Sequence, residues 1–453
     1  MVAVTGPRQS GKTTLARSEF ADLPYFNLEA PDTRFRIEAD PRGFLESVPQ
    51  GAVLDEFQRI PELVSYIQVV VDENPRTGRF ILTGSQQFEV MSKVSQSLAG
   101  RVGLLKLLPL AMQELQAARV TPASTCGTAS GNGLERANRW MFTGFYPRIY
   151  DHRLPPSQVL SDYFSTYVQR DVRSLTNVTD ASQFEKFVRL CAGRVGQVLN
   201  LQNLAQDLGV AHATAGRWLT ILQASFIVHL VQPYYWPTTK RLIKSPKMYF
   251  YDVGLASWLN GIESPAQLVT HPLRGHLFEN LILMETLKFR LNRGLRDNLY
   301  FYRDNGAAGV DLILELANGI FPIEIKAGIT LADDSFKGLR HLAKVVVPPP
   351  GKPPDGGGLV YGGTNAWVHA GTQVVGFEQL DALLRACGAG ARPGRLYRRC
   401  DHIRRGFGVA SWTSCLLFRQ GTSPRSAGAA EILRGSQAVC KARSDRAWAS
   451  VAR

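Results

Sequence analysis

The sequence contains no run of about 18 apolar residues, the length that a membrane-spanning helix requires. Its best candidate, residues 102–112, is shorter than this and includes Lys106. The N-terminus lacks the charged start, apolar core and small-residue cleavage site of a secretory signal. Six cysteines are scattered through 453 residues, without a C-x-x-C pair or a histidine spacing that indicates zinc. These absences argue against membrane-spanning and disulfide-stapled classes and predict a cytoplasmic protein without a membrane partner.

Acidic residues are fewer than basic ones, and the imbalance is concentrated in one segment. Lys and Arg number 52 against 38 Asp and Glu, which gives a formal net charge of +14. Residues 388–453 hold 13 Lys or Arg and 3 Asp or Glu, a net +10, so the preceding residues carry only +4. The basic composition by itself therefore does not predict a nucleic-acid-binding protein.

This basic segment is rich in Arg, Ala, Ser and Gly and shows neither a helical nor a strand-like apolar period. Three interpretations stay open: out-of-frame translation of a GC-rich gene, a disordered tail, or a nucleic-acid-binding arm. Two further stretches, residues 120–133 and 348–358, are rich in Gly, Pro and small polar residues. They are predicted to be exposed linkers.

The strongest motif of the sequence begins at residue 6. Residues 2–5 are predicted to form a short buried strand, and the residues that follow match G-x-x-x-x-G-K-[ST] without a mismatch. The two glycines allow a tight backbone turn with N–H groups directed at phosphate oxygens, and a helix starting near Lys12 adds its positive end. Lys12 should reach the β- and γ-phosphates, and the Thr13 hydroxyl should bind Mg²⁺. The predicted nucleotide-binding residues are Gly6, Arg8, Gln9, Ser10, Gly11, Lys12, Thr13 and Thr14.

Two further strands are predicted to end beside these phosphates. An apolar strand that begins at residue 51 ends in Asp55 and Glu56, and parallel strands place their carboxyl ends at one edge of a sheet. Asp55 is expected to bind Mg²⁺ through water, and Glu56 to polarise the attacking water as a general base. A third strand, residues 79–85, ends in hydroxyl side chains. There Ser85 either senses the γ-phosphate or marks an ordinary turn.

Five segments occur in order along the chain: GPRQSGKTT, VLDEFQRIP, ILTGSQQF, SLAGRVGLLKLLPLAMQEL and GFYPRIY. Together they resemble the bacterial and archaeal AAA-type ATPases that carry a C-terminal domain of unknown function, and the resemblance runs from residue 2 to about residue 385. It implies ATP hydrolysis with ATP and Mg²⁺ as cofactors. It also implies that Arg101 is a sensor or an arginine finger, with a surface ion pair as an equal alternative. Arg101 thereby joins Lys12, Glu56 and Ser85 as a predicted catalytic residue. Members of that family usually carry a few dozen residues before the first strand, so we expect a late start codon or a truncated chain.

Residues 134–235 are predicted to be largely helical and to include a helix-turn-helix. An amphipathic helix from residue 201 ends at Gly209, a second helix begins near His212, and an alternating segment after it suggests a strand of a wing. If this unit contacts double-stranded DNA, His212, Thr214 and Arg217 are the side chains expected to face a groove. The second helix has a single Arg near its start, so a packing or protein-contact module is the open alternative.

A different pattern follows. Glu279 lies near the start of a predicted helix, Asp311 lies on a predicted strand, and Glu324 and Lys326 lie on another. The pattern resembles the active site of the PD-(D/E)xK nuclease fold. Since residues i and i+2 of a strand share a face, Glu324 and Lys326 point together, and Asp311 can converge with Glu324 on Mg²⁺. Lys326 would then orient a hydrolytic water, with Glu279 completing the site. A solvated charge pair on an amphipathic strand is the alternative.

We expect an α/β protein with a P-loop NTPase parallel sheet, a helical and winged-helix middle domain, and a nuclease-like α/β C-terminal domain. The predicted function is Mg²⁺-dependent ATP binding and hydrolysis, coupled to double-stranded DNA through the region His212–Arg217. An ATP-gated, metal-dependent DNA nuclease and a non-enzymatic nucleotide-sensing module stay open as alternatives, as does the oligomeric state. The predicted divisions are an ATPase core at residues 1–118, a linker at 119–133, the helical region at 134–235, the nuclease-like domain at 236–386, and a basic, disordered tail at 387–453.

Overall fold

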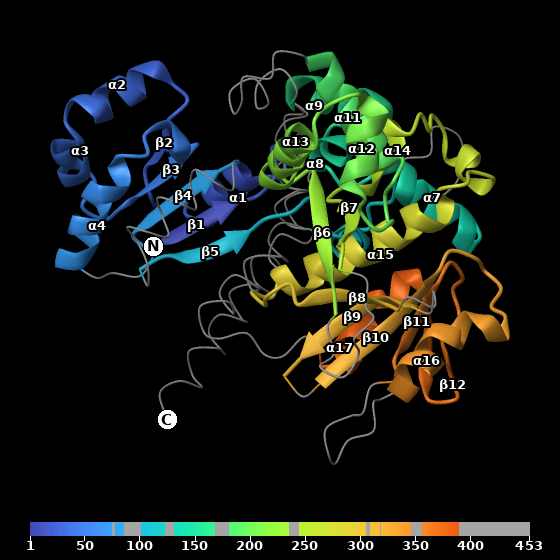
Figure 1. The fold of residues 1–453 in the computed structure, drawn as a ribbon. Helices are drawn as coiled ribbons and strands as arrows, with labels where there is room; N and C mark the ends of the chain where they lie inside the picture. The colour runs from blue at the N-terminus through green and yellow to red at the C-terminus, as the bar shows by residue number, and fades with distance from the viewer. Residues whose placement is uncertain are drawn as a thin grey trace, which may run out of the picture. The chain divides into compact units, whose positions relative to one another are not determined.

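The computed structural model describes residues 1–74, 78–85, 101–122, 131–167, 181–234, 244–304, 309–317, 319–345 and 356–388. Most of both predicted linkers and residues 389–453 of the basic segment lie outside these residues, so the expectations about them stay predictions. Figure 1 draws the described elements, from the blue N-terminal sheet to the orange C-terminal one.

The N-terminal part is a sheet of parallel strands in the order β2-β3-β4-β1-β5. The three central strands are short, apolar and almost wholly buried, as is typical of parallel strands covered on both faces. These three are the strands that the sequence predicts, so the expected parallel sheet is confirmed. The strands are β1 (Val2–Thr5), β2 (Tyr25–Asn27), β3 (Ala52–Asp55), β4 (Phe80–Gly84) and β5 (Gly103–Lys106).

Helices cover both faces of this sheet because neighbouring residues of a strand point to opposite sides. They are α1 (Lys12–Glu19), α2 (Pro31–Ala39), α3 (Pro41–Ser47) and α4 (Leu63–Glu73). Leu54 and Leu82 pack with side chains of α2, α3 and α4 on one face. Val53 and Ile81 pack with Ala16 of α1 on the other. Because the strands are parallel, the loops after β1, β3 and β4 leave the sheet at the same edge. Ligands bind at this edge in open α/β sheets.

The middle of the chain is helical, as predicted. Asn200 caps α12 by accepting a hydrogen bond from the N–H of Asn203, and Gly209 ends the helix with a φ of 67°. The next helix, α13, begins at His212, so two helices are joined by the expected short turn. The helices of this part are α7 (Gly133–Thr143), α8 (Pro147–Asp151), α9 (Pro156–Tyr167), α11 (Ala181–Ala192), α12 (Leu201–Leu208), α13 (His212–Ala224) and α14 (Val253–Leu259).

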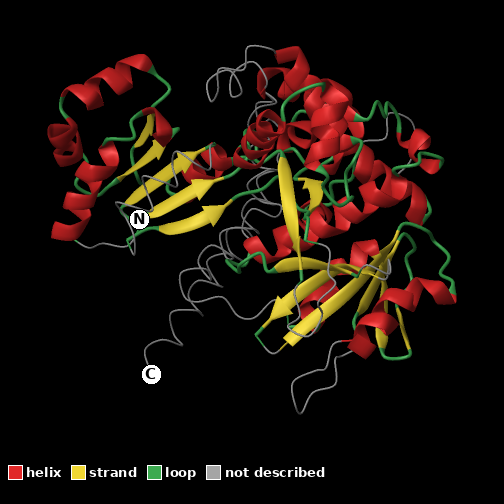
Figure 2. Cartoon of the chain, viewed as in Figure 1, coloured by secondary structure: helices red, strands yellow, loops and turns green. Residues whose placement is uncertain are grey.

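A mixed sheet follows, drawn in yellow in the lower part of Figure 2. Its described strands lie in the order β12-β13-β11-β10-β9-β8-β6-β7. Its strands are β6 (Val228–Pro233), β7 (Lys247–Phe250), β8 (Leu299–Arg303), β9 (Gly309–Leu316), β10 (Gly319–Lys326), β11 (Gly358–Tyr361), β12 (Trp367–His369) and β13 (Thr372–Gly376). β6 pairs with β7 on one side and with β8 on the other, so the hairpin after α13 is part of this sheet. Helices α15 (Arg274–Leu291), α16 (Lys337–Val345) and α17 (Leu380–Ala386) belong to the same part of the chain.

One hydrophobic cluster joins the helical middle to the mixed sheet. It extends from Leu108 to Leu384 and crosses the predicted boundary between residues 235 and 236, which therefore divides no core. Leu108 and two residues of α6 (Met112–Ala117), Met112 and Leu115, belong to this cluster, although the predicted ATPase core reached residue 118. Apolar periodicity shows that a segment is buried, but it does not show which core buries it.

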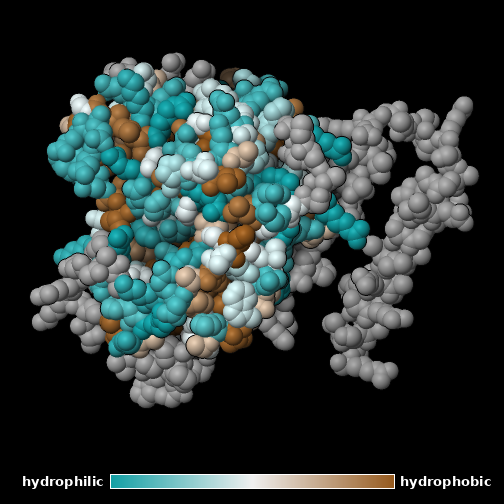
Figure 3. Space-filling model, turned by 90° about the vertical axis from the view of Figure 1, so that its right-hand side faces the viewer, coloured by the Kyte–Doolittle hydropathy of each residue, from teal (hydrophilic) through white to brown (hydrophobic). Residues whose placement is uncertain are grey.

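Apolar side chains on the surface are scattered. Figure 3 shows small groups of apolar residues among hydrophilic ones on the face that it draws. Phe35 and Val368 are 75% and 70% exposed, and single exposed residues of this kind are ordinary on a protein surface. None of the helices in the described part of the chain is both long enough and apolar enough to cross a membrane.

Candidate nucleotide-binding site

The loop between β1 and α1 is shaped by three residues with positive φ. Gly6, Gln9 and Gly11 have φ angles of 152°, 59° and 92°. A Cβ atom at Gly6 would lie 2.0 Å from the backbone oxygen of Leu107, so only glycine fits there. A Cβ at Gly11 would meet nothing within 4 Å, so the loop faces open space at this point. Backbone turns of this kind form a concavity that suits an anion.

Lys12 is folded into this loop. Its side chain is buried, and Nζ donates hydrogen bonds to the carbonyl oxygens of Gly6 (3.0 Å) and Pro7 (2.7 Å). These bonds hold the ammonium beside the N-terminus of α1, where the helix dipole adds further positive charge. The positive charge that an anionic ligand requires is therefore fixed at the loop.

An unsatisfied hydroxyl also suits a phosphate at this loop. Ser10 Oγ is buried and has no hydrogen-bond partner among the described residues. A buried polar group without a partner costs about 1–3 kcal/mol, and a phosphate oxygen would accept its hydrogen bond. Arg8 is half-buried on the same loop, and Gln9 and Thr14 are exposed. The residues present thus fit the phosphates of a nucleotide.

Asp55, at the end of β3, accepts hydrogen bonds from three hydroxyl groups. Thr13 donates to Oδ2 over 2.9 Å, Tyr25 donates to the same oxygen over 2.6 Å, and Thr83 donates to Oδ1. The Asp55 side chain is buried, so these bonds fix the direction of its carboxylate. Thr13 and Asp55, the two predicted magnesium ligands, therefore lie together, and their oxygen atoms are the type that Mg²⁺ prefers.

Glu56 and Ser85 meet beside this group. Glu56 has a φ of 54°, a strained value for a residue with a side chain, and such strain is concentrated at functional sites. Its Oε2 accepts hydrogen bonds from Gln58 Nε2 and, over 3.4 Å, from Ser85 Oγ. The end of β3 thus carries two carboxylates with separate hydrogen-bond partners, and the end of β4 supplies a hydroxyl to each.

Tyr25 and Thr83 are members of this group that the sequence analysis did not single out. Tyr25 lies on β2, next to β3 in the sheet, and Arg17 lies 4.8 Å from the centre of its ring. Burial and the hydrogen bond to Asp55 raise the pKa of the Tyr25 hydroxyl well above its ordinary value, so it remains a donor. A single tyrosine on a strand of three residues forms no sequence pattern that could have indicated its role. Thr83 does lie in a strand end that the sequence analysis described as rich in hydroxyl side chains.

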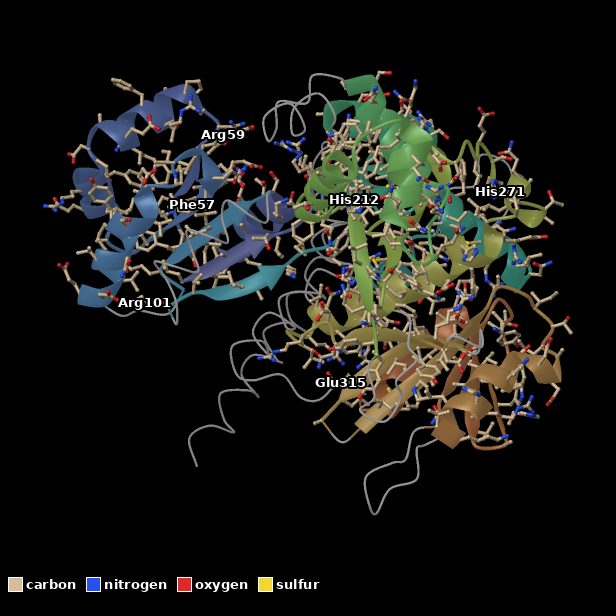
Figure 4. The ribbon with its side chains drawn as sticks, viewed as in Figure 1. Phe57, Arg59, Arg101, His212, His271 and Glu315 are labelled. Carbon is tan, nitrogen blue, oxygen red and sulfur yellow. The ribbon has the colours of Figure 1, made fainter. Side chains whose placement is uncertain are left out.

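Arg101 lies elsewhere on this unit. It comes just before β5, at the opposite end of the parallel strands from the loop after β1 (Figure 4). Its guanidinium pairs with both carboxylate oxygens of Asp72 on α4, with Nη2 3.0 Å from Oδ2. The structure therefore does not bring Arg101 to Lys12 and Glu56 of its own chain, and the surface ion pair is the arrangement that it forms.

Three stretches of the chain match models of known protein families. A family model described as an AAA domain matches residues 1–116. Two models described as domains of unknown function, DUF8612 and DUF4143, match residues 134–266 and 274–380. Uncharacterized proteins of Mycobacterium tuberculosis and Mycobacterium bovis are 31% identical over 330 residues, which make up 72% of this chain and 70% of each relative. The chain belongs to the same family as these proteins. Its N-terminal part is an AAA domain, which is an ATP-binding, ATPase-type module.

The second predicted site lies on the mixed sheet. α15, β9 and β10 bring Glu279, Asp311, Glu324 and Lys326 into one cluster, and β7 adds Lys247 between two of the carboxylates. Among the described residues, no three Asp, Glu, His or Cys side chains are arranged to hold a metal ion. The binding of Mg²⁺ by Asp311 and Glu324 stays a prediction. Lys247, which contacts Glu279 and lies 3.8 Å from Asp311, is a member of the cluster that the sequence analysis did not single out.

The third predicted group lies on α13. His212 and Arg217 are exposed, and Thr214 is half-buried and accepts a hydrogen bond from Arg217 Nη2 over 3.4 Å. Trp218 and Leu222 of the same helix are buried in the hydrophobic cluster. His212 and Arg217 therefore lie on the solvent side of α13, whereas Thr214, four residues before Trp218, lies at the edge of the buried face.

Proposed function

We propose that this protein binds ATP together with Mg²⁺ and hydrolyses it to ADP and phosphate. The observation that carries the proposal is the grouping of Thr13, Asp55 and Glu56 at the sheet edge where the loop holds Lys12. Phosphoryl transfer requires positive charge at the phosphates, oxygen ligands for the metal and a carboxylate for the water, and these four side chains are of the right types. The AAA domain over residues 1–116 supports the same activity.

Each side chain has one task in this proposal. Lys12 exchanges the loop carbonyls for oxygens of the β- and γ-phosphates. Thr13 and Asp55 hold Mg²⁺, which supplies charge neutralisation at the phosphates. Glu56 takes a proton from water as the water oxygen attacks the γ-phosphorus, and the bond to the bridging oxygen breaks with its electron pair leaving on ADP. Ser85, hydrogen-bonded to Glu56, lies at the end of β4 where it can sense the γ-phosphate.

Substitution of Lys12 tests the proposal. We expect Lys12→Ala to lower the rate of phosphate release about 10²–10³-fold, because it removes charge stabilisation from the transition state. Arg36→Ala, which removes an exposed cation from α2 of the same domain, should keep the wild-type rate. Phosphate release by Lys12→Ala at the wild-type rate would exclude this site. ATP binding without turnover by the wild-type chain would instead support the non-enzymatic sensor.

We further propose that α13 contacts double-stranded DNA. The order of elements supports this: α11 precedes residues 196–199, which pair with β7, and α12, α13, β6 and β7 follow. Two helices with a short hairpin beside them are typical of a winged helix, whose second helix can enter a groove. The exposed side chains of His212 and Arg217 provide hydrogen-bond donors on α13.

Duplex binding at several salt concentrations tests this second role. We expect wild-type protein to bind duplex DNA, and Arg217→Ala to bind more weakly, with the slope of log affinity against log salt reduced by about one. Arg340→Ala, which removes an exposed cation from α16, is the matched control and should leave the slope unchanged. The same samples show whether duplex DNA changes the rate of ATP turnover. Equal slopes for wild type and Arg217→Ala would remove α13 from the interface.

We place this activity in the cytoplasm. Cys191 is a thiol buried in the hydrophobic cluster, where burial raises its pKa and keeps it protonated. A buried thiol of this kind suits a reducing compartment.

A further inference from the structure

Lys247 lies inside the carboxylate cluster of the mixed sheet. Its Nζ is 2.7 Å from Glu279 Oε1 and 3.8 Å from Asp311 Oδ1. The Lys247 side chain is 8% exposed and that of Glu279 is 10% exposed, so the pair is withdrawn from water. An ammonium that contacts both carboxylates stands at the point where a divalent cation would bridge their oxygens.

Two further fixed donors bind the same two carboxylates. The Tyr249 hydroxyl donates a hydrogen bond to Glu279 Oε1 over 2.5 Å. The backbone N–H of Ile325 donates to Asp311 Oδ2 over 2.9 Å. A metal ion at this point would have to displace a buried ammonium, a buried hydroxyl and a backbone amide, each of which would then lack a partner.

Each carboxylate of the cluster already has an ammonium partner. Lys247 contacts Glu279 and lies 3.8 Å from Asp311, and Lys326 Nζ lies 2.6 Å from Glu324 Oε1. A further cation would have to compete with these ion pairs for the same oxygens.

The sheet holds Lys247 in place. Its backbone pairs with Val231 of β6 on one side and with Val198 on the other, so it is bounded by other segments on both edges. Its Nζ also lies 5.4 Å from the centre of the Phe301 ring. A lysine on a loop can swing away from a ligand, whereas this one is held by backbone pairing on both sides.

We propose that the ammonium of Lys247 replaces the divalent cation of this nuclease-like site, so that the site binds no metal and cleaves no phosphodiester bond through one. The likeness to the PD-(D/E)xK pattern then concerns the fold alone. The cluster instead joins β7 to α15 and β9 through Glu279 and Asp311. The inference is independent of ATP hydrolysis by the AAA domain.

Uptake of Mn²⁺ by the nucleotide-free full chain tests this proposal. Free Mn²⁺ is followed by its electron paramagnetic resonance signal during titration, and every sample carries Asp55→Asn to remove the cation ligand of the AAA domain. Three proteins are compared. The first retains Lys247, the second carries Lys247→Met, whose side chain is of similar length and uncharged, and the third carries Lys247→Arg, which keeps the charge. A circular dichroism melt of each variant reports whether it is folded.

We expect no Mn²⁺ uptake by the protein that retains Lys247 or by Lys247→Arg. Lys247→Met should take up one ion per chain, and adding Asp311→Asn to it should abolish that uptake. The proposal is overturned if the protein with Lys247 takes up Mn²⁺ and Asp311→Asn removes that uptake. It is equally overturned if Lys247→Met is folded and takes up none. The first of these outcomes needs no substitution of Lys247, so the proposal can be refuted even where Lys247→Met fails to fold.

Discussion

At the scale of single residues, the three hydroxyl groups around Asp55 decide how its carboxylate is presented. Thr13, Tyr25 and Thr83 all donate to it, so both of its oxygens are oriented before a ligand arrives. Of the three, Thr13 is itself a predicted metal ligand, whereas Tyr25 reaches the carboxylate from β2 and serves to position it. Groups that hydrogen-bond to metal ligands commonly change metal affinity about 10–100-fold.

We expect Tyr25→Phe to weaken the binding of Mg²⁺ in the presence of nucleotide by about tenfold, because the Asp55 carboxylate loses one of the bonds that orient it. The phenyl ring keeps the packing of Tyr25, so the fold should be retained. The measurement is a Mg²⁺ titration of a fluorescent ADP analogue bound to the protein, which needs no catalytic turnover. Nucleotide affinity without Mg²⁺ should be almost unchanged.

Tyr66→Phe is the matched control for this titration. Tyr66 lies on α4 of the same domain and is 36% exposed. Its loss should leave the Mg²⁺ titration as in the wild type. An unchanged titration for Tyr25→Phe, or an equal change for both variants, would show that the Tyr25 hydroxyl does not position Asp55.

At the scale of elements, the sequence predicts those whose pattern is local. β1, β3 and β4 are apolar runs that end at the glycine-rich loop, the paired acids and the hydroxyl-rich turn. The break between α12 and α13 follows from Gly209, whose positive φ ends the first helix. An element is predictable where the apolar run, motif or glycine that indicates it lies within about ten residues.

The sequence predicts relations between distant segments only where a motif marks each of them, as at Thr13 and Asp55. β6 pairs with both β7 and β8, which makes the helical middle and the mixed sheet one body, and no local pattern reveals such a pairing. Lys247 and Tyr25 were missed for the same reason. Each is a single residue on a short strand without a local motif, and its partner lies about thirty residues away, Glu279 for the first and Asp55 for the second.

At the scale of the whole molecule, the segment that leaves the AAA sheet is held by a buried ion pair on α15. Lys288 Nζ lies 2.7 Å from Glu285 Oε1 and donates to the carbonyl oxygen of Leu110 over 2.9 Å, while Glu285 Oε2 accepts from the N–H of Met112 over 2.7 Å. Lys288 Nζ also lies 3.8 Å from the centre of the Phe145 ring. The carbonyl of Leu110 and the N–H of Met112 thus fix the start of α6 and the residues before it to α15.

We expect Glu285→Ala to lower the free energy of unfolding by about 3–5 kcal/mol, because it leaves the Lys288 ammonium buried without its partner. The side chains of Lys288 and Glu285 are 1% and 5% exposed, so water cannot replace the lost contact. Urea unfolding followed by circular dichroism measures the loss. Glu263→Ala, which removes an exposed carboxylate from the same part of the chain, should leave the unfolding midpoint unchanged.

The double variant Glu285→Leu with Lys288→Met shows whether the two charges act as a pair. Removing both leaves no buried charge, so the double variant should be more stable than Glu285→Ala. It should still be less stable than the wild type, because the Leu110 carbonyl and the Met112 N–H each lose a partner at a cost of about 1–3 kcal/mol. A double variant no more stable than Glu285→Ala would mean that these backbone contacts carry the whole effect. α15 would then hold the segment through hydrogen bonds alone, with the charges contributing nothing.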